Sequence, residues 1–383
     1  MRFPGFSGEW ESRKIGEDCS VLMCKRIFAN QTSEHGDVPF YKIGTIGEEP
    51  DAYISRELFE DYKAKYNYPR KGEVMVTCAG TVGKTIVFNG DDSYYQDSNI
   101  VWLSNPKQLY LNSFLNYYLS RVNWNKLNST TITRIYNDNL RELIIKYPSI
   151  EEQEKIVSLL SLLDQRIAVQ NKVIEDLKKL KTALCTSLFS QGRTIVVAIS
   201  EIGDSFGTMN LSKEDLTDSG AECILYGELF TTYDRVIKEV KSHTSIETNG
   251  EVTTSGLNDL LFPASTTVDA ISLIAPAAIS KPGVILGGDM FGIRLSPQYN
   301  NRYMSNLLYY CYREELASYA QGSTIIHLHY KDIEKLKVMV HSKEYQDHIA
   351  DTLDILDNRI LNEQRTVYAF KCQKSYLIRR LFI

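Results

Sequence analysis

Residues 148–189 read PSIEEQEKIVSLLSLLDQRIAVQNKVIEDLKKLKTALCTSLF, and the architecture expected for the rest of the chain follows from this stretch. It contains no Gly and, after its first residue, no Pro, and Ser149 with the glutamates that follow suits the N-terminal end of a helix. Apolar residues recur at alternating spacings of four and three residues, which places them along one side of that helix. We therefore expect a helix of about 40 residues, roughly 60 Å long, whose apolar side needs a second helix to cover it. The packing residues that this spacing predicts are Ile156, Leu160, Leu163, Ile167, Ile174 and Leu177.

A second copy of this stretch lies at residues 341–382. Residues 324–382 align without a gap on residues 131–189. Two unrelated heptad helices would share the same apolar spacing, but identities outside it, such as Gln153 with Gln346, favour an internal duplication. The matching packing residues are Ile349, Leu353, Leu356, Ile360, Val367 and Phe370.

Each long helix can therefore find its partner within the same chain. We expect the two to form an intramolecular, antiparallel coiled coil, which gives the duplicated chain a pseudo-twofold repeat. Polar residues occupy two seam positions in each copy, and buried polar groups at such positions can fix the register of a coiled coil. These residues are Gln170, Lys181, Glu363 and Lys374.

The segments before the two helices have the composition of globular α+β domains with mostly antiparallel sheets. Short runs rich in β-branched and aromatic residues alternate with Gly, Asn, Asp and Pro, which is typical of strands joined by turns. We expect domains at 1–147 and 192–340, and long helices at 148–191 and 341–383. Strands are predicted at 38–46, 73–77, 85–88, 99–103, 143–147, 223–226, 259–263, 270–275, 284–286 and 290–295, and helices at 111–121 and 302–319.

Composition limits the class of protein. No apolar run is long enough to span a membrane, and the first residues resemble neither a signal nor a transit peptide. The seven cysteines are scattered, without metal-ligand or CxxC spacing, so we expect reduced thiols in a cytoplasmic protein. The net charge is −5. Residues 1–150 are balanced and residues 191–340 are net acidic, so a nucleic-acid interface would need local basic patches or charge from partners.

Two short motifs suggest chemistry that the surrounding residues do not support. Residues 78–85, CAGTVGKT, approach a phosphate-binding loop, but Cys78 replaces the first Gly and a strand-like run follows where a helix is needed. We expect a turn between two strands there. His327 and His329 would share one side of a strand, but no third metal ligand is near in sequence. We predict no catalytic residue, no metal site and no cofactor in this chain.

Three segments resemble the specificity (S) subunit of type I restriction–modification systems. They are RFPGFSGEWE at 2–11, GEVMVTCAGTVGK at 72–84 and, above all, PSIEEQEKIVSLLSLLDQRI at 148–167. The resemblance covers essentially the whole chain, including the duplicated order of domain and helix. The second half departs from the pattern, because it has no counterpart of Gly8–Glu11 and has His341 in place of Pro148.

The resemblance implies a non-catalytic DNA reader. Each globular domain would be a target recognition domain for one half of a bipartite site in double-stranded DNA, and the helices would set the unread gap. Two modification (methyltransferase) subunits would bind the chain, and restriction subunits would join them. S-adenosylmethionine, ATP and Mg²⁺ would belong to those partners. A helix of roughly 60 Å corresponds to about 17 base pairs.

Base recognition requires donor and acceptor side chains on loops or strand edges. The loops 128–134 and 321–327 are equivalent in the repeat and are the preferred candidates. In the first domain the candidates are Thr81, Lys84, Thr85, Gln96, Asn99, Lys126, Asn128, Ser129, Thr130, Thr131 and Arg134. In the second they are Lys241, Thr266, Thr267, Ser323, Thr324, His327 and Lys331.

Two other functions remain open from the sequence. A coiled-coil scaffold that joins other proteins would have the same helices without DNA recognition. A nucleotide-binding enzyme would use residues 78–85, with Lys84 on the phosphates.

Overall fold

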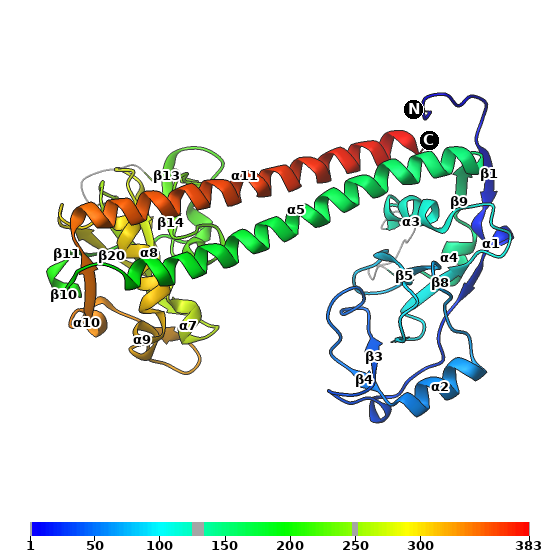
Figure 1. The fold of residues 1–383 in the computed structure, drawn as a ribbon, viewed down its shortest axis with the longest axis horizontal. Coiled ribbons are helices and arrows are strands. Elements are labelled where there is room, and N and C mark those ends of the chain that lie inside the picture. The colour runs from blue at the N-terminus through cyan, green and yellow to red at the C-terminus, as the bar shows by residue number, and fades with distance from the viewer. Residues whose placement is uncertain (1, 125–133, 247–251, 383) are drawn as a thin grey trace. The chain divides into compact units, whose positions relative to one another are not determined.

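The computed structural model describes residues 2–124, 134–246 and 252–382 (Figure 1). They divide into two compact units. Unit 1 consists of Met1–Gln170 and Arg365–Ile383, and unit 2 of Asn171–Gln364. Each long helix begins in one unit and ends in the other, since α5 spans Ile150–Ser190 and α11 spans Lys343–Leu381.

Unit 1 is an α+β domain with short strands. Its four-stranded sheet has the order β2-β8-β5-β6 and is antiparallel throughout. A second sheet has the order β4-β3-β7, and β1 pairs with β9. The strands are β1 (Glu11–Lys14), β2 (Ser20–Leu22), β3 (Val38–Tyr41), β4 (Tyr53–Ile54), β5 (Val74–Thr77), β6 (Thr85–Val87), β7 (Tyr94–Tyr95), β8 (Ile100–Ser104) and β9 (Ile144–Tyr147), and the helices before α5 are α1 (Ile15–Asp18), α2 (Arg56–Lys65), α3 (Asn112–Ser120) and α4 (Asn137–Arg141), with a 3-10 turn at Ala29–Gln31.

Unit 2 contains more strands on a similar plan. Its largest sheet has the order β11-β20-β16-β18-β14, and only the β14–β18 pair in it is parallel. A four-stranded sheet, β12-β15-β13-β19, and the pairs β17-β21 and β10-β22 complete it.

The strands of unit 2 are β10 (Thr194–Ala198), β11 (Gly203–Gly207), β12 (Leu216–Thr217), β13 (Ala221–Leu225), β14 (Val236–Ile237), β15 (Ser242–Thr244), β16 (Asp259–Pro263), β17 (Ser265–Thr266), β18 (Ala277–Ile279), β19 (Ile285–Gly287), β20 (Met290–Leu295), β21 (Ile326–His327) and β22 (Lys337–His341). The helices are α6 (Glu228–Thr231), α7 (Ala270–Leu273), α8 (Asn301–Cys311), α9 (Arg313–Ser318) and α10 (Tyr330–Ile333), with 3-10 turns at Ile199–Glu201 and Lys213–Asp215.

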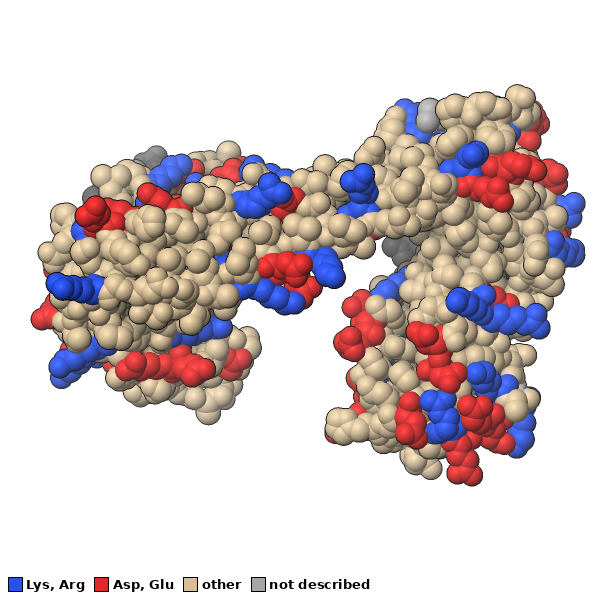
Figure 2. All heavy atoms as spheres, in the orientation of Figure 1, with Lys and Arg blue, Asp and Glu red and all other residues tan. Residues whose placement is uncertain are grey.

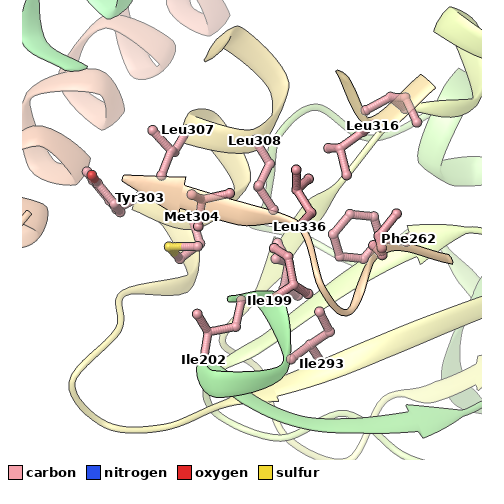
Figure 3. Close-up of a cluster of buried hydrophobic side chains, with 14 of the residues drawn as sticks. Ile199, Ile202, Phe262, Ile293, Tyr303, Met304, Leu307, Leu308, Leu316 and Leu336 are labelled. Atoms are coloured by element: carbon pink, nitrogen blue, oxygen red, sulfur yellow. The ribbon is translucent and has the colours of Figure 1, made fainter. Parts of the chain in front are cut away.

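Each unit buries one face of the long helices in its own core. In unit 1, Ile156 and Leu160 of α5 and Leu381 of α11 join the cluster that contains Phe114 and Trp10. In unit 2, the cluster drawn in Figure 3 gathers side chains from α8, β16, β20 and the turn at 199–201, and the same cluster includes Ile349 and Leu353 of α11. The helices are therefore part of both folded cores.

Within each unit the two helices run antiparallel. Asp164 contacts Lys374 in unit 1, and Lys181 contacts Asp357 in unit 2. Residues later in α5 therefore contact residues earlier in α11. All the packing residues that the heptad spacing predicts are buried or half-buried. The expected fold class, two α+β domains with an antiparallel pair of long helices, is confirmed.

A buried glutamine joins the start of each long helix to its unit. The Gln153 side chain accepts from Leu111 N at 2.8 Å and donates to Leu109 O and Pro148 O, both at 3.0 Å. In unit 2, Gln346 accepts from Asn300 N at 2.9 Å and donates to the carbonyls of residues 298 and 341. The identity of Gln153 and Gln346 thus has a structural cause, because each ties a helix start to the loop before α3 or α8.

Two local predictions were wrong. Residues 270–273 form helix α7, not a strand, because the Asp269 side chain caps the helix by accepting from Ser272 N at 2.6 Å. The helix predicted at 302–319 is broken at Tyr312, where a φ of −122° and a ψ of 10° separate α8 from α9. The Tyr312 hydroxyl accepts from Met339 N in β22 at 2.7 Å. Of the other predicted strands, 259–263 and 290–295 match β16 and β20 residue for residue, 38–46 shortens to β3, and the rest are present with ends shifted by one or two residues.

Candidate nucleic-acid interface

Three segments that carry predicted DNA-binding residues meet in unit 1. The turn after β5, the segment before β8 and the chain after residue 133 are joined at Cys78, whose N–H donates to Asn99 O at 2.7 Å and whose carbonyl accepts from Ile135 N at 2.9 Å. The guanidinium of Arg134 donates to Ser98 O at 3.2 Å. Thr81, Lys84, Gln96, Asn99 and Arg134 are all at least partly exposed along these segments.

The turn between β5 and β6 has a fixed shape. β5 pairs antiparallel with β6, so the prediction of a turn between two strands at residues 78–85 is confirmed. Thr77 closes the turn, because its N–H donates to Lys84 O at 3.0 Å and its hydroxyl accepts from Lys84 N at 3.0 Å. Gly83 has a φ of +81°, and a Cβ there would lie 2.0 Å from the Trp124 ring. A phosphate-binding loop would instead lead into a helix.

A cavity of about 310 Å³ lies beside Gln96 and Asn99. It is also lined by two cations, Arg26 and Lys42, which the sequence did not single out. Arg26 pairs with Asp97 at 2.9 Å and Lys42 with Asp51 at 3.1 Å. No spacing in the sequence connects these side chains with residues 96–99, so only the fold could reveal them.

Most candidates of unit 2 gather at a small hairpin, residues 321–327, and at the strand β17 that pairs with it. β17 pairs with β21, which places Thr266 opposite Ile326 and Ser265 opposite His327. Gln321 and His327 exchange backbone hydrogen bonds of 2.9 and 2.7 Å, and the exposed residues Ser323 and Thr324 lie in the turn between them. Thr267 follows β17 and is exposed, and Lys331 is exposed on α10.

Beside this hairpin is a cavity of about 470 Å³ with donor and acceptor side chains on its walls. His327 and His329 stack with ring centroids 5.9 Å apart, and His327 Nδ1 lies 3.8 Å from Asp289 Oδ2. Gln321 and Asp332 complete the polar lining. Within the described residues no group of three metal-ligating side chains forms. Such walls offer hydrogen bonds to a base edge, and two carboxylates make them a poor site for phosphate.

Some predicted residues are not part of these clusters. Lys241 precedes β15, which belongs to the sheet β12-β15-β13-β19, and it pairs with Glu239 at 3.0 Å. Thr85 belongs to β6 and is only partly exposed. Lys126, Asn128, Ser129, Thr130 and Thr131 lie outside the described residues.

Charge alone does not mark a DNA-binding face. On the side shown in Figure 2, acidic and basic side chains are interspersed over each unit. Three basic residues near the candidate site of unit 1 are already paired with carboxylates, including Lys84 with Glu48 at 3.0 Å. Burial raises the pKa of the Cys78 thiol beneath the turn to about 11, so it stays protonated near neutral pH. All seven cysteines lie within the described ranges and are free thiols.

Comparison with known proteins gives matches to both halves of the chain. The family model described as the type I restriction modification DNA specificity domain matches residues 7–179 and again 196–367. A Haemophilus influenzae protein, provisionally described as a type I restriction enzyme specificity subunit, is 48% identical over 164 residues, 43% of this chain and 42% of that protein. A Methanocaldococcus jannaschii protein with a similar provisional description is 25% identical over 206 residues, 48% of this chain and 46% of the relative. Each match therefore spans less than half of the relative.

Solved structures share the fold across the chain. The S subunit of a type I restriction–modification system from M. genitalium superposes with a TM-score of 0.59 at 17% identity, over 100% of this chain and 99% of that one. A chain from a study of assembly and conformational transition of the type I R-M system also gives 0.59, at 14% identity over 98% of both chains. Within the described residues, no helix is both long enough and apolar enough to cross a bilayer.

Proposed function

Because the chain belongs to the family of type I restriction modification DNA specificity domains, we propose that it is the specificity subunit of such a complex. The observation that carries this proposal is the double match of the family model, once to each copy of domain and helix. Each copy supplies one target recognition domain, and the two together read a bipartite site in double-stranded DNA.

The candidate sites suit base reading better than phosphate binding. Gln96, Asn99 and Arg134 in unit 1, and Gln321 and His327 in unit 2, offer the donors and acceptors that distinguish base edges. The basic residues nearby are engaged in ion pairs and the net charge is −5. Partner subunits therefore contribute much of the phosphate neutralisation.

The remaining parts of the activity belong to partners in this proposal. Two modification subunits dock on the long helices and transfer the methyl group, with S-adenosylmethionine as donor, and restriction subunits bring ATP- and Mg²⁺-dependent cleavage. The chain itself selects the sequence and catalyses no step. We place the complex in the cytoplasm, where free thiols are stable.

Methylome sequencing of cells with and without the chain tests this function. We expect one bipartite motif to be methylated only when the chain is present. Replacing residues 192–340 by the matching segment of a relative should change one half-site and leave the other and the gap unchanged. Methylation that is the same in both cells would refute the proposal, and an exchange without effect on either half-site would favour a scaffold.

A further inference from the structure

Two ion pairs connect the long helices, one in each unit. In unit 1, Lys374 Nζ lies 2.5 Å from Asp164 Oδ1. In unit 2, Lys181 Nζ lies 2.6 Å from Asp357 Oδ1. The gapless repeat aligns Lys181 with Lys374 and Asp164 with Asp357, so the duplication has preserved both partners of each pair.

A tyrosine from the recognition domain completes each pair. Tyr117 of α3 donates its hydroxyl proton to Asp164 Oδ2 at 2.7 Å, and its ring centroid lies 5.2 Å from Lys374 Nζ. Tyr310 of α8 has its ring centroid 5.9 Å from Lys181 Nζ. Tyr117 and Tyr310 are also equivalent when the repeat is extended toward the N-terminus. We call Lys374, Asp164 and Tyr117 the first clamp, and Lys181, Asp357 and Tyr310 the second clamp.

The clamps specify one register, which the apolar seam does not. If one helix slides past the other by seven residues, the apolar residues of the two seams find similar contacts again. Each clamp joins a single lysine to a single aspartate, and the residue numbers of the two pairs sum to the same value, as one antiparallel register requires. A slide would therefore break both ion pairs together.

Burial makes such a slide costly, most of all in the second clamp. The Lys181 side chain is 4% exposed and that of Asp357 is 16% exposed. Burial alone would lower the pKa of Lys181, but Asp357 and Asp234 outweigh it and raise the pKa, so the ammonium keeps its charge. A buried ammonium without its carboxylate would pay the full desolvation penalty.

We propose that the two clamps fix the register of α5 against α11, fix each recognition domain on the helix pair, and so restrict the complex to one gap length. This inference rests on the proposed function. A slide of seven residues, which the apolar seam alone would allow, moves a helix by roughly 10 Å, about three base-pair steps. The clamp residues are positioning residues, because their effect on DNA passes through the domains they hold.

The test removes the two charges and keeps the side-chain bulk. The full chain with Lys181→Met and Lys374→Met is combined with its modification subunits, and methylation is sequenced on a DNA library in which the gap varies. We expect unchanged half-sites, with methylation at gaps about three base pairs shorter or longer raised by about tenfold. Lys179→Met is the matched control, because Lys179 is exposed on the same helix and pairs with Glu175 at 2.6 Å.

The possible results separate the two proposals. Sequence-specific methylation at a single gap by the double variant would overturn the clamp proposal and leave the proposed function intact. Methylation without any sequence preference by the unaltered chain would refute the proposed function itself. If the double variant does not fold, Lys374→Met alone decides, because the first clamp is the more exposed one. Exchanging the charges of the second clamp, Lys181→Asp with Asp357→Lys, should keep the single gap that Lys181→Asp alone would lose.

Discussion

At the scale of single residues, two glutamines explain why the starts of the long helices are alike. Gln153 and Gln346 are almost fully buried, and each satisfies backbone groups of the loop before α3 or α8. The sequence showed them only as an identity outside the apolar seam. The hydrogen bonds that they accept, from Leu111 N and Asn300 N, join residues more than 40 positions apart, so this role could not be read from local spacing.

We predict that Gln153→Ala destabilises unit 1 by about 2–4 kcal/mol, because one buried N–H and two carbonyls lose their partner. Thermal unfolding monitored by circular dichroism measures the change. Gln165→Ala is the control, since Gln165 is exposed on the same helix and should change the free energy of unfolding by less than about 0.5 kcal/mol. Equal effects of the two variants would contradict this role.

A second prediction concerns Asp18, which is buried in unit 1. Its carboxylate accepts from Tyr110 Oη at 2.7 Å and from Lys107 Nζ at 3.1 Å. Burial alone would raise the pKa of Asp18, but these hydrogen bonds outweigh it and hold the pKa below its usual value. Because the pKa of Asp18 is lower in the folded state, its ionised carboxylate stabilises the fold at pH values above the unfolded-state pKa, near 4. This stabilisation is lost as the pH falls through the folded-state pKa.

Asp18→Asn should therefore lower the free energy of unfolding by about 1–3 kcal/mol near pH 7, and by progressively less as the pH falls below about 4. Urea denaturation of both proteins across that range measures the difference. Asp138→Asn serves as control, because Asp138 is exposed and pairs with a neighbouring arginine on α4. A difference that stays constant with pH would disprove the account.

At the scale of elements, the turn between β5 and β6 has a geometry that requires glycine. Gly83 combines a positive φ with close approach to Trp124. We predict that Gly83→Ala destabilises the turn by about 1–3 kcal/mol or more and impairs the first half-site while the second is still read. Methylation of half-site variants together with thermal unfolding measures both effects. Gly44→Ala is the control, because a Cβ there meets nothing within 4 Å.

The long helices and most strands could be predicted, because heptad spacing and β-branched runs are local signals. The strand predicted at 270–275 was wrong because this segment carries two local signals, a β-branched run and a helix-capping Asp269. In the structure the cap prevails and α7 forms. The break at Tyr312 was not predictable, since no Gly or Pro marks the point where the backbone leaves helical geometry between α8 and α9. The hairpin at 321–327 could be selected as a candidate from the sequence, because the repeat aligns it with the loop 128–134. Arg26 and Lys42 could be found only from the structure, which places them beside Gln96 and Asn99.

At the scale of the whole molecule, the lengths of α5 and α11 lead to a prediction about the gap. Inserting seven helix-forming residues after both Gln170 and Gln364 keeps the seam and both clamps in register. The helices lengthen by roughly 10 Å, so we expect the gap to grow by about three base pairs with the half-sites unchanged. Methylome sequencing reports both quantities.

The same insertion in only one helix is the control. It prevents the two clamps from forming together, and we expect loss of stability and of gap specificity. A double insertion that leaves the gap unchanged would show that the helices do not measure the DNA.

The division of each long helix between the units also orders events during synthesis. Leu381 and Phe382 complete the core of unit 1, where Phe382 lies against Phe114 with ring centroids 4.8 Å apart. All of residues 171–364, which form unit 2, are made between the two parts of unit 1. At usual translation speeds of about 5–20 residues per second, the nascent first domain waits roughly 10–40 s for its missing side chains. During that time its apolar residues are open to chaperones, and a chain that ends prematurely leaves them exposed to proteolysis.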